Sequence, residues 1–197
     1  MEGEVKLLHL SWGDVQRLAE EVAERVRGSG FRPDVVVAVS RGGFDPARIL
    51  CDQLSVRRLA SLQIEYYTDV NRRRGAPEVV FPLNADVSGL RVLVVDDVSD
   101  SGDSLRAAKD HVLGRGALEV RVATLHVKPW SRFRPDYYAE EVDAWVVYPW
   151  EPRETLISMA GMLRDEGLSP SEVRRRLIEK GFSPELVSRL LQGFSKT

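Results

Sequence analysis

Two short runs of apolar residues constrain the fold of this chain most strongly. Residues 33–40, PDVVVAVS, and 91–98, RVLVVDDV, are each long enough for a strand and too short for a buried helix. Runs without polar alternation are typical of strands covered on both faces, as in parallel sheets. Because each run is followed by a glycine-containing loop and then by a helical pattern, the sequence predicts strand–helix units of an α/β domain.

Strand and helix patterns continue to alternate up to about residue 151, and only helical patterns follow. Helical patterns cover 11–30, 44–54 and 102–116, and strands are predicted over 57–67, 79–84, 119–129 and 143–149. The expected fold is a mostly parallel twisted sheet flanked by helices. Two later Ser-Pro-acid patterns are typical helix starts, so the remainder predicts a small helical tail. We therefore expect an α/β domain over 1–151 and a tail of unassigned role over 152–197.

Composition and charge narrow the classes of function. A net charge of −2 over 197 residues gives no support for non-specific binding to nucleic acid. The single cysteine, Cys51, excludes an internal disulfide framework. No apolar run is long enough to span a membrane, and the N-terminus lacks the pattern of a signal peptide. We expect a cytoplasmic protein that does not bind membranes.

Residues 96–104, DDVSDSGDS, place many acids and hydroxyls directly after a buried strand. The hydroxyls of Ser99, Ser101 and Ser104 can bind an anion, and Gly102 lets the backbone approach it closely. The following helix adds free N–H groups and the positive end of its dipole. The segment therefore predicts a cradle for a phosphate monoester.

The carboxylates of this segment cannot bind phosphate, because like charges repel, so they must bind a different part of the ligand. Asp96 and Asp97 suit sugar hydroxyls, or a Mg²⁺ ion that bridges to other phosphates. Asp100 is free to act as a base or to stabilise positive charge. The alternatives are a helix N-cap with surplus acids or a Ca²⁺ loop. The glycine, the hydroxyls and the preceding apolar strand favour a site for a phosphorylated sugar.

Two further strand ends carry chemically distinctive groups. The segment SRGG, 40–43, follows the first apolar run, and Lys128 with Pro129 closes the strand over 119–129. The carboxyl ends of parallel strands lie at one edge of a sheet, and ligands bind there. We expect these two ends and the acid–hydroxyl segment to line a single rim.

The segment VLVVDDVSDSGDSL resembles the phosphoribosyl pyrophosphate (PRPP) motif of type I phosphoribosyltransferases. That motif is an apolar strand, two acids, two variable residues, Asp, Ser or Thr, Gly, any residue, and Ser or Thr. The matching residues are Asp96, Asp97, Asp100, Ser101, Gly102 and Ser104, while Asp103 stands where Gly is common. The resemblance implies the type I fold, PRPP binding along 96–104, Mg²⁺ at the two leading acids, and Asp100 as the catalytic residue.

Three other segments resemble the 6-oxopurine branch of that family, the xanthine-guanine and hypoxanthine-guanine phosphoribosyltransferases. SRGGF is similar to the pyrophosphate loop, where a non-proline cis peptide is common; its residues here are Ser40, Arg41, Gly42 and Gly43. VATLHVKP is similar to the strand whose lysine, here Lys128, bonds the purine 6-oxo group. DAWVVYPWE is similar to the segment that stacks on the purine, which implies roles for Trp145, for the backbone of Val146, and for Glu151 at the 2-position.

The resemblance implies an enzyme of purine salvage. It would transfer ribose 5-phosphate from PRPP to N9 of xanthine, guanine or hypoxanthine, with Mg²⁺, and release pyrophosphate. A lysine opposite O6 selects oxopurines, because adenine would present a donor to a donor. The basic segment NRRRG, with Arg72, Arg73 and Arg74, falls where the family has a mobile loop that closes over PRPP. The family also implies a homodimer or homotetramer.

Two other classes of function remain open. A PRPP-sensing transcriptional regulator could retain this fold, and the arginines at 174–176 in the tail are the feature that supports it. A transferase for another base, such as orotate, is the second. Neither class would need Lys128 with a stacking Trp145 downstream, so the purine enzyme is the favoured interpretation.

Overall fold

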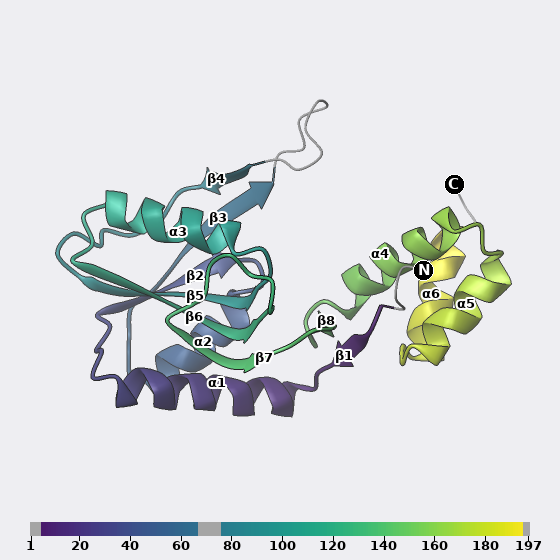
Figure 1. The fold of residues 1–197 in the computed structure, drawn as a ribbon, viewed down its shortest axis with the longest axis horizontal. Coiled ribbons are helices and arrows are strands. Elements are labelled where there is room, and N and C mark those ends of the chain that lie inside the picture. The colour runs from purple at the N-terminus through teal and green to yellow at the C-terminus, as the bar shows by residue number, and fades with distance from the viewer. Residues whose placement is uncertain (1–4, 67–75, 195–197) are drawn as a thin grey trace. The chain divides into compact units, whose positions relative to one another are not determined.

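The computed structural model describes residues 5–66 and 76–194, with side chains up to residue 191. The chain forms two compact units (Figure 1). The larger contains Gly13–Asp143, and the smaller combines the segment ending at Trp12 with the segment that starts at Ala144. The domain boundary predicted from the sequence lies eight residues later, after residue 151. Compact units are not by themselves separately folding domains, so that boundary stays a prediction.

The larger unit is built on a six-stranded sheet with the order β4-β3-β2-β5-β6-β7. Every neighbouring pair is parallel except β3 with β4, the edge hairpin. The predicted mostly parallel sheet is therefore confirmed. The strands are β2 (Val35–Ser40), β3 (Leu59–Tyr66), β4 (Pro77–Phe81), β5 (Arg91–Ser99), β6 (Glu119–Val127) and β7 (Tyr137–Glu141).

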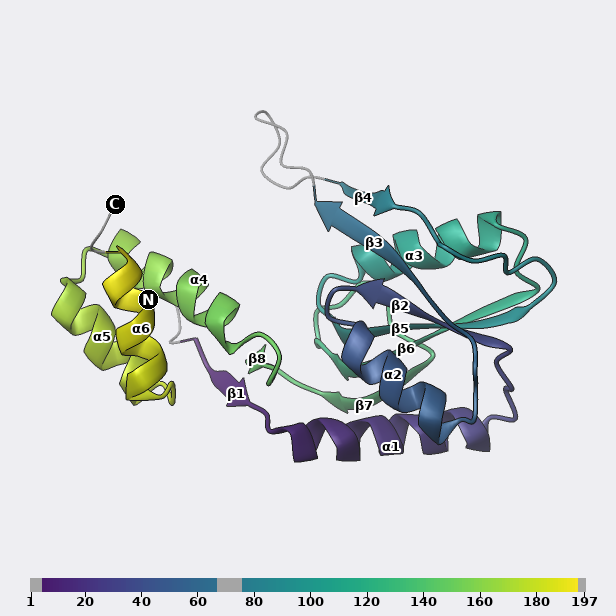
Figure 2. The ribbon, with the colours of Figure 1, turned by 180° about the vertical axis from the view of Figure 1, so that it is seen from behind.

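Helices cover both faces of this sheet. α2 (Phe44–Gln53) follows β2 and α3 (Asp103–Gly114) follows β5, and Figure 2 shows them on opposite faces. In the strand order, β3 lies on one side of the β2–β5 pair and β6 lies on the other. Because both crossover connections are right-handed, their helices lie on opposite faces of the sheet. The order thus reverses between β2 and β5, where doubly wound sheets bind their ligands. α1 (Trp12–Gly28) lies beside β7, and Arg25 donates to the backbone carbonyl of Ala139 at 3.0 Å.

The uninterrupted apolar runs are explained by burial on both faces. Val35, Val37 and Val39 of β2 pack with residues of β5 against α3, whose buried side chains are Leu105, Ala108 and Val112. Val36 and Ala38 point to the other face and are equally inaccessible to water. Each fully buried valine stabilises the fold by roughly 1.5 kcal/mol or more, so polar residues have no place within these strands.

The smaller unit has a core of its own. β1 (Leu7–His9) pairs in parallel with β8 (Trp145–Val147), and three helices follow, as the tail pattern predicts: α4 (Pro152–Asp165), α5 (Pro170–Glu179) and α6 (Pro184–Phe194). Ser169 and Glu172 form a capping box at the start of α5. Val147 packs with buried residues of all three helices. Of the helices in the described residues, none has the length and apolar character needed to cross a membrane.

Two details of the predicted strands were wrong. The strand over 143–149 is present as β8, but it pairs with β1 in a separate two-stranded sheet and not in the main sheet. β1 and β7 were not predicted at all, because β1 has only three residues and β7, YYAEE, lacks a long apolar run.

His126 on β6 should make the stability of the fold depend on pH. Its ring is fully buried, and burial, with the positive charges of Lys128 and Arg17, lowers its pKa to about 4. The unfolded chain binds this proton near pH 6.5, so the contribution is complete above pH 6.5 and is lost as the pH falls towards 4. We expect the free energy of unfolding to fall by roughly 2 kcal/mol over this interval on account of His126. Denaturant titrations at stepped pH measure it.

The variant His126→Gln should flatten this part of the stability profile whatever its stability at neutral pH. His9→Gln, which changes an exposed histidine, is the matched control and should keep the slope. An unchanged slope in His126→Gln would contradict the assignment.

Candidate active site

The loop after β2 meets the acid pair of β5 at the point where the strand order reverses. A Cβ atom added to Gly42 would overlap the carboxylate of Asp97, and one added to Gly43 would overlap the backbone carbonyls of Val39 and Val95. Only glycine fits at either position without a shift of its surroundings. The peptide bond between Ser40 and Arg41 is cis. The predicted pyrophosphate loop and the predicted metal ligands therefore lie side by side.

The acid pair belongs to the strand itself. β5 runs to Ser99, and Asp96 stands opposite Thr124 of β6, so both acids lie within the sheet and do not follow it. Asp97 is buried, and this burial raises its pKa to about 6, although the backbone N–H of Val98 donates to its carboxylate at 2.7 Å. A carboxylate that is costly to ionise gains most from a cation or from hydroxyl donors placed beside it.

The predicted phosphate loop has the expected helix behind it. Gly102 is the N-cap of α3 and has a left-handed backbone, with φ +85°, where glycine is favoured. The first N–H groups of α3 therefore start at this loop, because a helix leaves them without intrahelical acceptors. The hydroxyl of Ser101 accepts from the N–H of Asp103 and lies 3.3 Å from the hydroxyl of Tyr66.

Two of the predicted site hydroxyls donate to backbone carbonyls of the protein. Ser99 is 1% exposed, and its hydroxyl donates to the carbonyl of Phe133 at 2.9 Å. Ser40 donates to the carbonyl of Leu62 on the neighbouring strand at 3.1 Å. Both were chosen from their place in the motif. Their partners, a loop carbonyl for Ser99 and a carbonyl of the neighbouring strand for Ser40, could not be predicted from the sequence, and a role of either hydroxyl in binding stays a prediction.

Segment 128–133, which follows β6, is bonded directly to the phosphate loop. The N–H of Lys128 donates to the carbonyl of Ser99 at 2.9 Å, and the N–H of Arg132 donates to the carbonyl of Ser101 at 3.0 Å. The guanidinium of Arg132 lies 3.6 Å from the carboxylate of Asp103. These contacts bring the third predicted strand end to the same rim as the loop.

The ammonium of Lys128 is largely withdrawn from water. Its residue is 6% exposed, and burial lowers its pKa, while the nearby carboxylates of Asp100 and Asp143 act in the opposite direction. A lysine held this way, beside a loop suited to phosphate, is poorly explained as a surface residue. A cation at this position suits the recognition of a polar group of a ligand.

Trp130 is a site residue that the sequence analysis missed. Its indole N–H donates to the carboxylate of Asp100 at 2.9 Å, and the ammonium of Lys128 lies 5.6 Å from its ring centroid. More than half of the side chain is exposed, so it is not held there by a hydrophobic core. Its position directly after Lys128 and Pro129 was the only available signal.

Other predicted site residues lie elsewhere in the chain. Trp145 and Val146 are on β8 and Glu151 is the N-cap of α4, all within the smaller unit. Their part in a purine site stays a prediction. Arg72, Arg73 and Arg74 lie outside the described residues.

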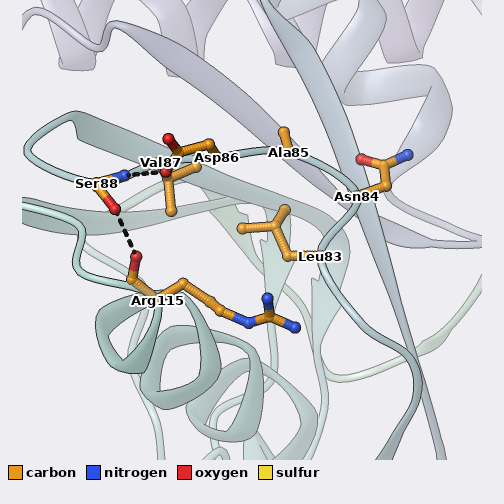
Figure 3. Close-up of a pocket in the computed structure, with 7 residues that line it drawn as sticks. All are labelled: Leu83, Asn84, Ala85, Asp86, Val87, Ser88 and Arg115. Carbon is orange, nitrogen blue, oxygen red and sulfur yellow. Dashed lines mark hydrogen bonds between the residues drawn. The ribbon is translucent and has the colours of Figure 1, made fainter.

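A surface hollow of about 460 Å³ lies away from this rim. Figure 3 shows its lining, which comes from the loop between β4 and β5 and from Arg115 after α3. The loop precedes β5, so the hollow lies at the amino end of that strand, opposite the acid pair. It contains no predicted site residue, and Ser88 there bonds to Asp86 and to the carbonyl of Arg115.

Comparisons with known proteins agree with this geometry. A family model described as a phosphoribosyl transferase domain matches residues 9–155, most of the chain. The chain belongs to the phosphoribosyltransferase family. The match crosses both compact units and ends in the first turn of α4, so α5 and α6 lie outside it.

Individual relatives of this phosphoribosyltransferase carry related names. It is 31% identical to a xanthine-guanine phosphoribosyltransferase of Ruegeria, over 74% of this chain and 86% of that one. The corresponding protein of Gluconobacter oxydans is 32% identical, over 80% and 91%. The structure of a purine phosphoribosyltransferase from Pyrococcus horikoshii shares 35% identity and a TM-score of 0.66, over 74% and 94%.

Gly42→Ala tests the contact between the two loops in this phosphoribosyltransferase. The new methyl group must displace the buried carboxylate of Asp97. We expect affinity for PRPP, measured by calorimetry, to fall at least about tenfold, since the acid pair loses its position. Gly114→Ala is the matched control, because its added Cβ meets open space at the end of α3. Wild-type PRPP affinity in Gly42→Ala would contradict the proposed site.

Proposed function

We propose that this phosphoribosyltransferase acts on purines and transfers the ribose 5-phosphate of PRPP to N9 of a 6-oxopurine. The observation that carries the proposal is the withdrawn Lys128, bonded through its backbone to the loop suited to a sugar phosphate. The names of the relatives support the same class of acceptor. Xanthine, guanine and hypoxanthine are the candidate bases.

The donor would lie across the two loops at the reversal of strand order. Ser101, Gly102 and Ser104, with the N-terminus of α3, would hold the 5′-phosphate, because N–H groups and the helix dipole favour an anion. Arg41 and the backbone of Gly42 and Gly43 would hold the pyrophosphate. The acids Asp96 and Asp97 would accept from the ribose hydroxyls.

The acid pair also fits Mg²⁺ as a cofactor. Among the described residues, no cluster of three or more histidine, cysteine or acidic side chains is arranged to hold a metal. One or two carboxylates suffice, however, where substrate oxygens and water complete an octahedral Mg²⁺ site. When bound, the ion would neutralise charge on the pyrophosphate.

The acceptor base would meet Lys128. Its ammonium can donate to O6 of an oxopurine and has no acceptor to offer the amino group of adenine. Stacking by Trp145, a backbone contact from Val146 and an accepting role for Glu151 at the 2-position remain part of the proposal.

In the transfer, the bond from C1′ to the pyrophosphate oxygen breaks and N9 of the purine bonds to C1′. The electron pair of the broken bond leaves with pyrophosphate, whose negative charge Arg41 would stabilise. Positive charge develops on the ribose ring. Asp100 would stabilise that charge or accept the proton that the purine loses from N7.

A nucleotide-sensing role is the second candidate. The structure of a Neisseria gonorrhoeae protein with bound ppGpp shares 27% identity and a TM-score of 0.68 with this chain, over 76% of this chain and 92% of that one. A regulator that binds PRPP or a guanine nucleotide without turnover would use the same loops. The cytoplasmic location and the dimer or tetramer stay predictions.

Release of pyrophosphate from PRPP and Mg²⁺ separates these functions. We expect release with at least one of xanthine, guanine and hypoxanthine, and less than about 1% of that rate with adenine or orotate. Adenine would present its amino donor to the donor of Lys128, and orotate is a pyrimidine that has no N9 to receive the ribose. Release with orotate or adenine alone would contradict the proposed acceptor. Binding of PRPP or ppGpp without turnover of any base would favour the sensor.

A further inference from the structure

The most informative group that the proposed function leaves unused is Trp130. Tryptophan side chains are mostly buried in folded proteins, yet Trp130 is 55% exposed. It lies between two residues with proposed roles, Lys128 and Asp100, and contacts both.

The backbone around Trp130 forms a hydrogen-bonded turn. The N–H of Ser131 donates to the carbonyl of Lys128 at 3.0 Å, which closes a turn with Pro129 and Trp130 at its centre. Proline restricts the first central position of such a turn. The N–H of Arg132 is then bonded to the phosphate loop. The indole is therefore carried on a segment that is held at both ends.

The two contacts of the indole differ in kind. Its N–H is only a donor, and a carboxylate is its strongest ordinary acceptor. The indole N–H of Trp130 donates to Oδ1 of Asp100 at 2.9 Å, so a ligand would be recognised by the other carboxylate oxygen, Oδ2. The ring faces the ammonium of Lys128 at 5.6 Å, within the range of a cation–π interaction.

We propose that Trp130 is a positioning residue that holds Asp100 and Lys128 in place before the base binds. The inference rests on the proposed function of those two residues. Asp100 follows the end of β5 and is exposed, so without the indole N–H its carboxylate would have several rotamers to choose from. The ring similarly limits the motion of a four-carbon lysine side chain.

Trp130→Phe tests the N–H alone, because phenylalanine keeps an aromatic face for Lys128. We expect kcat to fall about tenfold, a fraction of what a positioned base contributes, with KM for PRPP unchanged within about twofold. In an Asp100→Ala background the same change should lower kcat by less than about twofold, since the group it positions is gone. Wild-type kcat in Trp130→Phe, or an equal fall in both backgrounds, would overturn the inference.

Trp130→Ala tests the ring as well. We expect KM for the base to rise about fivefold beyond that of Trp130→Phe, because Lys128 loses its aromatic neighbour. Equal KM values in the two variants would overturn the part of the inference that concerns Lys128. Trp12→Phe is the matched control: Trp12 is also 55% exposed but contacts the ring of Trp150, and its variant should match the wild type.

A measurement without turnover separates this inference from the proposed function. The chain has four tryptophans, and the indole N–H signal of Trp130 in a nitrogen–proton NMR spectrum is assigned by its loss in Trp130→Phe. In Asp100→Ala this signal should move upfield while that of Trp12 stays, because a charged acceptor has been removed. If no base is turned over, the proposed function fails, and this shift still decides the contact. An unmoved signal overturns it.

Discussion

The pairing of β5 with β6 is the constraint on which the candidate site depends. The ladder continues past the acid pair to Ser99 opposite Val127, and the N–H of Lys128 then donates to the carbonyl of Ser99. Two loops that are far apart in sequence, one suited to a sugar phosphate and one carrying the lysine, are thereby fixed at a common edge. A shift of this register by one residue would turn the side chains of the shifted strand to the other face of the sheet.

The site holds charged groups under conditions that are unfavourable without a ligand. Burial opposes the charge of Asp97 and that of Lys128, and hydrogen bonds or neighbouring charges offset only part of this cost. Groups whose pKa is shifted in this way are more common at binding sites than in structural positions. The apolar residues of β2 and β5, which are buried on both faces of the sheet, stabilise the fold and offset the unfavourable burial of these charges.

The sequence was sufficient for features that depend on local pattern. Uninterrupted apolar runs predicted β2 and β5, the motif predicted the loop before α3, and Ser-Pro pairs predicted the start of α5. Features that depend on tertiary contact were missed. The pairing of β1 with β8 joins two three-residue strands that lie more than 130 residues apart in the sequence, and the contact of Trp130 with Asp100 spans two loops. The hydroxyls of Ser40 and Ser99 match a binding motif, but each donates to a backbone carbonyl that is distant in the sequence.

The central claim is that the ammonium of Lys128 donates to the 6-oxo group of the base and thereby selects oxopurines over adenine. Its most direct test is the ratio of kcat/KM for hypoxanthine to that for adenine, in the wild type and in Lys128→Gln. The account predicts that the ratio falls about 100-fold, because glutamine offers both a donor and an acceptor. Lys109→Gln, which changes a lysine 5.9 Å from the ring of Phe133, should keep the wild-type ratio. An unchanged ratio in Lys128→Gln would contradict the account.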